Sequence, residues 1–207
     1  MGITIALAGN PNCGKTTLFN ELTGSKQHVG NWPGVTVDKK EGTYRKNKDV
    51  MILDLPGTYS LSPYSAEEIV ARDYIVKDRP DVVIDIVDGT SIERNLYLSL
   101  QIMETGIPMV IALNMMDEVK ARGDEIDFRK LSEKLGVPVV PVVARSGRGL
   151  EELMEAALGT AGKVTEAGRP GMFGGELEKV IAAIADVLGE EDPEGSWWKA
   201  VRLVEND

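Results

Sequence analysis

A chain of 207 residues with 43% hydrophobic and 27% charged residues is long enough for one α/β domain and a small appendage. Its net charge of −10 argues against a general nucleic-acid-binding protein, because most of the surface would repel a phosphate backbone. The single cysteine excludes an intramolecular disulfide. A predicted strand follows Met1 directly, so we expect no signal peptide. No apolar run approaches the roughly 18 residues that a membrane span needs, so we expect no such span.

The first predicted strand, residues 3–8, leads into a phosphate-binding loop. Residues 9–16 fit the pattern G-x-x-x-x-G-K-S/T, and residues 15–24 have helical character. A strand, a glycine turn and a helix N-terminus direct backbone N–H groups and the positive end of a helix dipole at a phosphate. In this pattern Lys15 reaches the β- and γ-phosphates, and the Thr16 hydroxyl binds Mg²⁺. The other loop residues expected to contact the nucleotide are Gly9, Asn10, Asn12, Cys13, Gly14 and Thr17.

The next two β-rich runs end in a second nucleotide motif. Residues 35–44 and 50–55 flank a polar turn, which predicts a hairpin and one antiparallel edge strand. Asp54 and Gly57 then form a D-x-x-G motif. In nucleoside triphosphatases this carboxylate holds Mg²⁺ through water and the glycine amide bonds the γ-phosphate, so the following loop responds to hydrolysis.

Helices and strands alternate through the rest of the first 160 residues. Residues 82–87 and 108–113 are nearly continuous apolar runs, as expected for strands covered on both faces. This alternation predicts an α/β fold with a doubly wound, mostly parallel six-stranded sheet and helices on both faces. The remaining predicted elements are a strand at 138–143 and helices at 65–77, 92–105, 127–135 and 149–158.

The strand at 108–113 is followed by a motif that selects the base. Asn114 and Asp117 fit N-x-x-D, with Met115 between them. The Asp117 carboxylate can accept from the ring N1–H and exocyclic amine of guanine, a donor pair that adenine lacks. Asn114 is expected to brace the loops and approach the guanine carbonyl. Three residues after the last strand are expected to bring a backbone amide to that carbonyl: Val143, Ala144 and Arg145.

The composition changes after residue 158. We expect a GTPase domain over 1–160, a glycine-rich linker over 161–175 and a partial helical domain over 176–207. Apolar residues recur at helical spacing in 176–188, and 197–204 suggests one further helix. Two helices bury little surface by themselves, so they must pack on the main domain, on a partner or on further residues.

Four segments resemble the translation-factor-related GTPases, which have a Ras-like P-loop fold, and more closely the cytosolic N-terminal domain of the ferrous iron transport protein B family. They are residues 9–20, 29–37, 54–61 and 113–118. The segment VGNWPGVTV at 29–37 discriminates most, since other GTPases of the group keep little there beyond the threonine. The resemblance covers 1–158 and implies that 170–207 begins a dissociation-inhibitor-like helical domain that modulates nucleotide release. Val143 departs from the family, which often has Ser or Thr there.

The resemblance also assigns roles to the two loops nearest the phosphates. It implies that Thr36, on a first switch loop that also carries Gly34, joins Thr16 and Asp54 at Mg²⁺. It further implies that Asn12 binds K⁺ beside the phosphates. The residues expected to support catalysis are therefore Lys15, Asn12, Thr36 and Gly57.

No motif in the sequence identifies the residue that orients the attacking water. Thr58 stands where Ras-like proteins have a glutamine, and its shorter side chain cannot easily do the same work. We expect slow turnover, with backbone groups of the first switch positioning the water. Tyr59 and Trp32 are the alternative side chains.

The expected function is slow, potassium-stimulated GTP hydrolysis coupled to ferrous iron transport. The resemblance implies a membrane permease domain as partner and a location at the cytoplasmic face of the inner membrane. Small accessory proteins and nucleotide-dependent self-association are further expected, and nucleic acid is not. The alternatives are a GTP/GDP switch in which hydrolysis is only a reset, and a GTPase of the ribosome or tRNA. With one histidine and one cysteine, no iron site is predicted on this domain.

Overall fold

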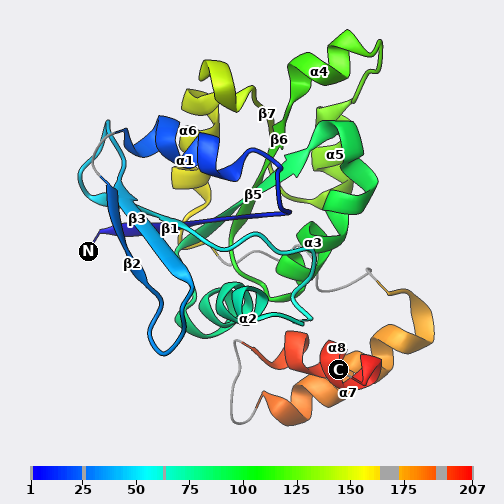
Figure 1. Cartoon of the computed structure of the whole chain (residues 1–207). Coiled ribbons are helices and arrows are strands. Elements are labelled where there is room, and N and C mark those ends of the chain that lie inside the picture. Colours follow the sequence, from blue (N-terminus) through cyan, green and yellow to red (C-terminus); the bar gives the residue numbers. More distant parts are fainter. Residues whose placement is uncertain (1, 25–26, 63, 164–172, 190–194, 207) are drawn as a thin grey trace.

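A seven-stranded mixed sheet forms the centre of the computed structural model, which describes residues 2–24, 27–62, 64–163, 173–189 and 195–206 (Figure 1). The strand order is β2-β3-β4-β1-β5-β6-β7. The strands are β1 (Ile3–Gly9), β2 (Gln27–Asn31), β3 (Asp38–Thr43), β4 (Val50–Asp54), β5 (Val82–Asp88), β6 (Met109–Asn114) and β7 (Val139–Pro141). Strands β4, β1, β5, β6 and β7 run parallel, whereas β3 is antiparallel to both β2 and β4. The predicted α/β, mostly parallel fold is confirmed.

Helices cover both faces of this sheet. On one face α1 (Lys15–Thr23) and α6 (Leu150–Thr160) pack on alternate strand residues such as Ile5 and Leu7. On the other face α2 (Ala66–Asp73), α3 (Ile92–Glu104) and α5 (Phe128–Leu135) pack on the intervening residues, such as Ala6. Because side chains alternate across a strand, a strand buried on both faces needs apolar residues at nearly every position. This explains the continuous apolar runs of β5 and β6.

Three local features differ from the sequence prediction. The sheet has a seventh strand, β2, whose exposed sequence QHVGN lacks the alternation that identifies a half-buried strand. The predicted helix 65–77 is divided: a capping box between Ser65 and Glu68 starts α2, and a π-helical turn over Tyr74–Asp78 follows it. A short helix, α4 (Met116–Ala121), begins within the N-x-x-D motif and was not predicted.

The two C-terminal helices form a small unit beside α3 (Figure 1). Helices α7 (Gly175–Leu188) and α8 (Ser196–Glu205) share a core that includes Ile181 and Val201. Arg202 of α8 ties this unit to the sheet domain through an ion pair with Glu104 at 2.7 Å. Most of the predicted linker 161–175 lies outside the described residues, so the domain limits stay predictions. Among the described residues, no helix is long and apolar enough to cross a bilayer.

Candidate functional site

The loop between β1 and α1 has the backbone that its glycines predict. Gly14, the N-terminal cap of α1, has φ +93°, and a Cβ there would lie 2.3 Å from Nδ2 of Asn114. Only glycine satisfies both the conformation and this close approach. The loop borders a cavity of about 630 Å³ whose lining residues are Asn10, Pro11, Asn12, Gly14, Lys15, Thr16, Thr17, Gly57 and Met115.

A second cavity, of about 430 Å³, joins the phosphate loop to the segments that carry Thr36 and Asp54. Lys15 and Asp54 both line it and form a buried ion pair of 2.5 Å. The predicted Mg²⁺ donors Thr16, Thr36 and Asp54 all line it, together with Gly57. Two hydroxyls and a carboxylate are the oxygen donors that a hard divalent cation prefers. Gly34 lies in the same turn between β2 and β3 as Thr36, with φ +78°.

Asn114 fastens three segments together. Its Nδ2 donates to the Cys13 carbonyl at 2.9 Å, and its Oδ1 accepts from the Ala144 amide at 3.0 Å. One buried side chain therefore joins the phosphate loop, β6 and the segment after β7, so the predicted brace is confirmed. The Ala144 amide donates to Asn114, and its expected contact with the guanine carbonyl stays a prediction. Val143 lines a different cavity, with Met116 and Glu152.

Asp117 lies in the first turn of α4 and forms an ion pair with Arg145. Met115 precedes it in the left-handed region, at φ +61°, so a strained turn sets the start of this helix. The Asp117 carboxylate is 26% exposed and the Arg145 side chain 71% exposed. The carboxylate that is predicted to read the base thus has a solvent-exposed cation as its partner. The sequence predicts a backbone contact for Arg145, and no motif in it indicates this pair.

The three side chains considered for water positioning each have another partner. Thr58 is buried, its amide donates to the Gly9 carbonyl at 3.2 Å, and its hydroxyl donates to the Ser60 carbonyl at 2.5 Å. Tyr59 lies under the Arg94 guanidinium. Trp32 is buried and packs edge-on against Tyr74, with ring centroids 5.3 Å apart.

The second cavity also contains a residue that the sequence analysis missed. Glu67, in the first turn of α2, lines it beside Lys15 and Thr36. The S-x-x-E capping pattern of Ser65 and Glu68 could have placed Glu67 at a helix start. Nothing in the pattern indicated that this helix start would face the phosphate loop.

Two buried groups, one in the phosphate loop and one on β5, have raised pKa values. Burial, with a smaller contribution from Asp85, raises the pKa of Cys13 to about 12, so this thiol is protonated at neutral pH and is not a nucleophile. Burial raises the pKa of Asp85 to about 7, partly offset by a hydrogen bond from Ser99.

Comparisons with known proteins identify the family. The family model described as ferrous iron transport protein B matches residues 3–157. The Fe(2+) transporter FeoB of Escherichia coli is 51% identical over 156 residues, which are 73% of this chain and 20% of that protein. A fusion of Fe(2+) transport protein A with Fe(2+) transporter FeoB from Porphyromonas gingivalis is 47% identical over 193 residues, 91% of this chain and 23% of that protein. The chain therefore spans about a fifth of these curated relatives.

Solved structures agree with this assignment over the whole chain. An S. thermophilus NFeoB variant bound to GDP superposes with a TM-score of 0.93 at 48% identity, covering 99% of this chain and 80% of that one. A second NFeoB variant, bound to GDP and AlF4−, has a TM-score of 0.87 at 48% identity, with the same coverage. With the phosphate loop, the D-x-x-G segment and the N-x-x-D segment gathered at one end of the sheet, the chain belongs to the ferrous iron transport protein B family, as its N-terminal GTPase domain.

Proposed function

We propose that this domain binds GTP and hydrolyses it slowly in a potassium-stimulated reaction, and that the cycle regulates or drives ferrous iron transport through a membrane domain outside the chain. The observation that carries the proposal is that Lys15 at the start of α1, Asp54 at the end of β4 and Asn114 at the end of β6 meet around the phosphate loop. The full-length relatives are Fe(2+) transporters, which supports the coupling to iron.

The phosphate loop and the N-x-x-D segment together support binding of a guanine nucleotide. The α1 N-terminus and Lys15 supply positive potential inside an acidic protein, and the Asp117 carboxylate accepts the two guanine donors. The side-chain amide of Asn10 is buried, and neither of its polar atoms has a hydrogen-bond partner among the described residues. Buried amides without partners are rare in native proteins. Because Asn10 lines the 630 Å³ cavity, a bound nucleotide or its water is the natural partner.

The catalytic residues stabilise charge rather than form bonds to the substrate. Thr16, Thr36 and Asp54 would hold Mg²⁺, which neutralises charge on the phosphates when bound. Lys15 adds a fixed positive charge at the transferring group. Backbone groups of the first switch loop, which carries Thr36, would position the attacking water, because Thr58, Tyr59 and Trp32 are otherwise engaged.

Asn12 is the residue proposed to hold K⁺. It is exposed, lines the larger cavity and has φ +67°, so its carboxamide stands at the solvent-facing side of the loop. A carboxamide oxygen is a suitable donor for a monovalent cation. The added positive charge would serve where other GTPases use an arginine finger.

The test is GTP turnover in K⁺ against Na⁺ at equal ionic strength. We expect turnover about tenfold faster in K⁺, and Asn12→Ala should remove the difference by removing one transition-state charge. Asn20→Ala is the control, because Asn20 is an exposed asparagine on α1 that lines neither cavity of the site. Equal rates in the two salts would contradict the role of K⁺ while leaving nucleotide binding intact.

A regulatory switch is the second candidate. Ser62, five residues after Gly57, accepts a hydrogen bond from Arg202 of α8 at 3.2 Å, so a change in the second switch would reach the C-terminal helices. Iron flux through the full-length protein with a non-hydrolysable GTP analogue separates the two candidates. A switch would sustain flux with the analogue, and a hydrolysis-driven pump would not.

A further inference from the structure

The loop between β2 and β3, which carries Thr36, is a short closed turn. The Trp32 amide donates to the Val37 carbonyl at 2.9 Å, and this bond continues the antiparallel register of the two strands. Inside it, the Val35 amide donates to the Trp32 carbonyl at 3.3 Å, and Gly34 has φ +78°. A proline followed by a glycine with positive φ is typical of a type II turn. Thr36 therefore lies between a defined turn and a paired residue.

Both ends of this turn are fastened in the hydrophobic core. Trp32 and Val37 are buried in the cluster on the α2 and α3 face of the sheet. The Trp32 ring packs edge-on against Tyr74, with an angle of 66° between the ring planes, and Nζ of Lys39 lies 5.4 Å from the Trp32 ring centroid. Both are favourable contacts of an indole ring. Thr36, by contrast, is exposed and lines the second cavity.

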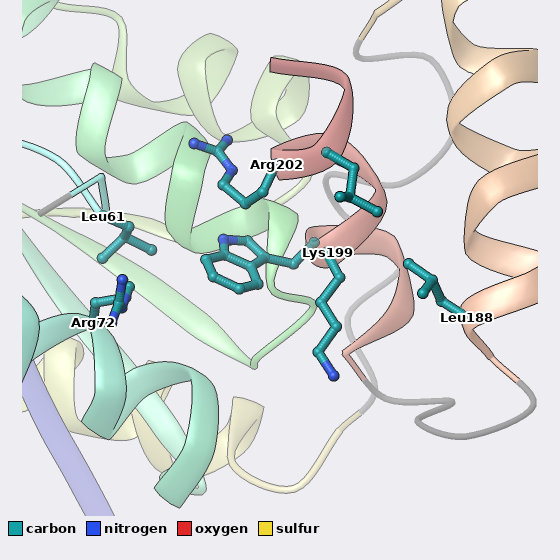
Figure 2. Close-up of a pocket in the computed structure, with 7 residues that line it drawn as sticks. Leu61, Arg72, Leu188, Lys199 and Arg202 are labelled. Carbon is teal, nitrogen blue, oxygen red and sulfur yellow. The ribbon is translucent and has the colours of Figure 1, made fainter. Parts of the chain in front are cut away.

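The helix that receives Trp32 is itself held in place. Tyr74 is the first residue of the π-helical turn that follows α2, and the capping box fixes the start of α2. Ala71 and Ile75 bury this segment against the sheet. Figure 2 shows Arg72 of α2 on the side of a cavity opposite the residues of α8. The helix thus contacts the Thr36 loop at its C-terminal end and faces the C-terminal helices with another residue.

We propose that Trp32 is a positioning residue for Thr36. Its side chain, packed on Tyr74, fixes the turn so that the Thr36 hydroxyl stays at the second cavity, which Lys15 and Asp54 also line. A loop that the chain itself holds in place loses less conformational entropy when a ligand binds than a switch loop that the ligand must order. The role toward Thr36 rests on the proposed function, whereas the anchoring of the turn by Trp32 does not.

The anchor is tested by hydrogen exchange of the intact chain without nucleotide. Trp32→Leu should speed exchange of the Val35 amide about tenfold, because the turn opens locally once the ring contact is lost. Val137→Ala is the control: Val137 is buried in the same cluster but lies next to β7, at the opposite edge of the sheet from β2. An unchanged rate in Trp32→Leu, or an equal increase in both variants, would overturn the proposal.

A matched pair at Tyr74 tests the ring contact separately. Tyr74→Phe keeps the ring and should leave exchange of the Val35 amide unchanged. Tyr74→Leu removes the aromatic pair and should speed that exchange about threefold, the size expected for one edge-on contact. Equal effects of the two substitutions would contradict anchoring through the rings.

The positioning role is tested by nucleotide affinity. In the proposed function Thr36 serves the triphosphate complex, so Trp32→Leu should raise the Kd of a non-hydrolysable GTP analogue about fivefold and leave the Kd of GDP unchanged. Trp32→Phe, which keeps a ring, should recover most of the affinity. In a Thr36→Ala chain, Trp32→Leu should have no further effect, because both substitutions remove the same contact. Additive effects, or an equal loss for GDP, would show that Trp32 does not act through Thr36.

The two sets of measurements keep the proposals distinguishable. Faster exchange of the Val35 amide with an unchanged Kd for the GTP analogue would reject the positioning role and retain the anchor. If the chain bound no guanine nucleotide, the proposed function would fail and the role toward Thr36 would fail with it. The exchange rates of the Trp32 and Tyr74 variants would then still decide whether Trp32 anchors the turn.

Discussion

Asn114 is the residue on which the geometry of the nucleotide site depends most directly. Asn114→Ala would leave the Cys13 carbonyl and the Ala144 amide without partners in a buried position. Each such group costs about 1–3 kcal/mol, so we expect the free energy of unfolding to fall by about 3 kcal/mol. Affinity for GDP and GTP should fall together, because the brace supports the loop rather than one phosphate. Urea unfolding and titration with a fluorescent guanine nucleotide measure the two effects. An Asn114→Ala chain as stable as the parent would contradict the brace.

For Arg145 we expect the opposite effect of a substitution, namely stronger nucleotide binding. Guanine must share the Asp117 carboxylate with Arg145 or displace it, so Arg145→Gln should strengthen guanine nucleotide binding. Because Arg145 is 71% exposed, solvent screens the pair and the gain should be only about threefold. The gain should also shrink as salt is raised, since salt weakens the competing pair in the parent. Weaker binding by the variant at all salt concentrations would show that Arg145 assists the base instead of competing with it.

At the scale of elements, the buried carboxylate on β5 makes stability depend on pH. The pKa of Asp85 is about 7 in the folded chain because of burial, against about 3.9 for an unfolded aspartate. Between these values the folded state keeps a proton that the unfolded state has lost. The free energy of unfolding therefore falls as pH rises from about 4 to 7, by up to about 1.4 kcal/mol per pH unit.

Asp85→Asn should remove this dependence, because an amide keeps an acceptor for the Ser99 hydroxyl and does not ionise. We expect the variant to match the parent near pH 4 and to exceed it by about 2–4 kcal/mol at pH 8. Urea unfolding at the two pH values measures the difference. Burial also raises the pKa of Glu104 to about 7, and its contribution remains in both chains. A constant difference between the two proteins at all pH values would contradict the raised pKa of Asp85.

The elements also show what the sequence could and could not predict. The parallel strands were predicted because burial on both faces requires continuous apolar runs, as in β5 and β6. Strand β2 was missed because its pairing with β3 is a long-range property of the backbone, and its polar side chains leave no pattern. The candidate site was predicted in part for the same reason. Motif spacing predicted Lys15, Asp54 and Asn114. The ion pair of Arg145 with Asp117 and the place of Glu67 in the second cavity depend on where loops and helix ends meet in space, which no motif encodes.

At the scale of the whole molecule, one buried ion pair holds the C-terminal helices against the sheet domain. Arg202 and Glu104 are 8% and 6% exposed, and burial already raises the pKa of Glu104 despite the opposing charge of Arg202. Removing one partner of such a pair leaves an uncompensated buried charge, whereas replacing both by apolar residues is often neutral. The pair therefore fixes the position of α8 on the sheet domain, and it adds little to the free energy of unfolding beyond what two apolar residues would give.

We therefore expect Arg202→Met to destabilise the chain by about 3 kcal/mol and to increase hydrogen exchange in α7 and α8. Arg202→Met combined with Glu104→Leu should recover most of the stability. Lys179→Met is the control, because the Lys179–Glu176 pair lies on α7 but is exposed on both sides and should contribute little. Urea unfolding and hydrogen exchange read out global and local stability separately. If the double variant were as unstable as the single one, the specific ion pair, rather than the absence of an unpaired buried charge, would hold the helices in place.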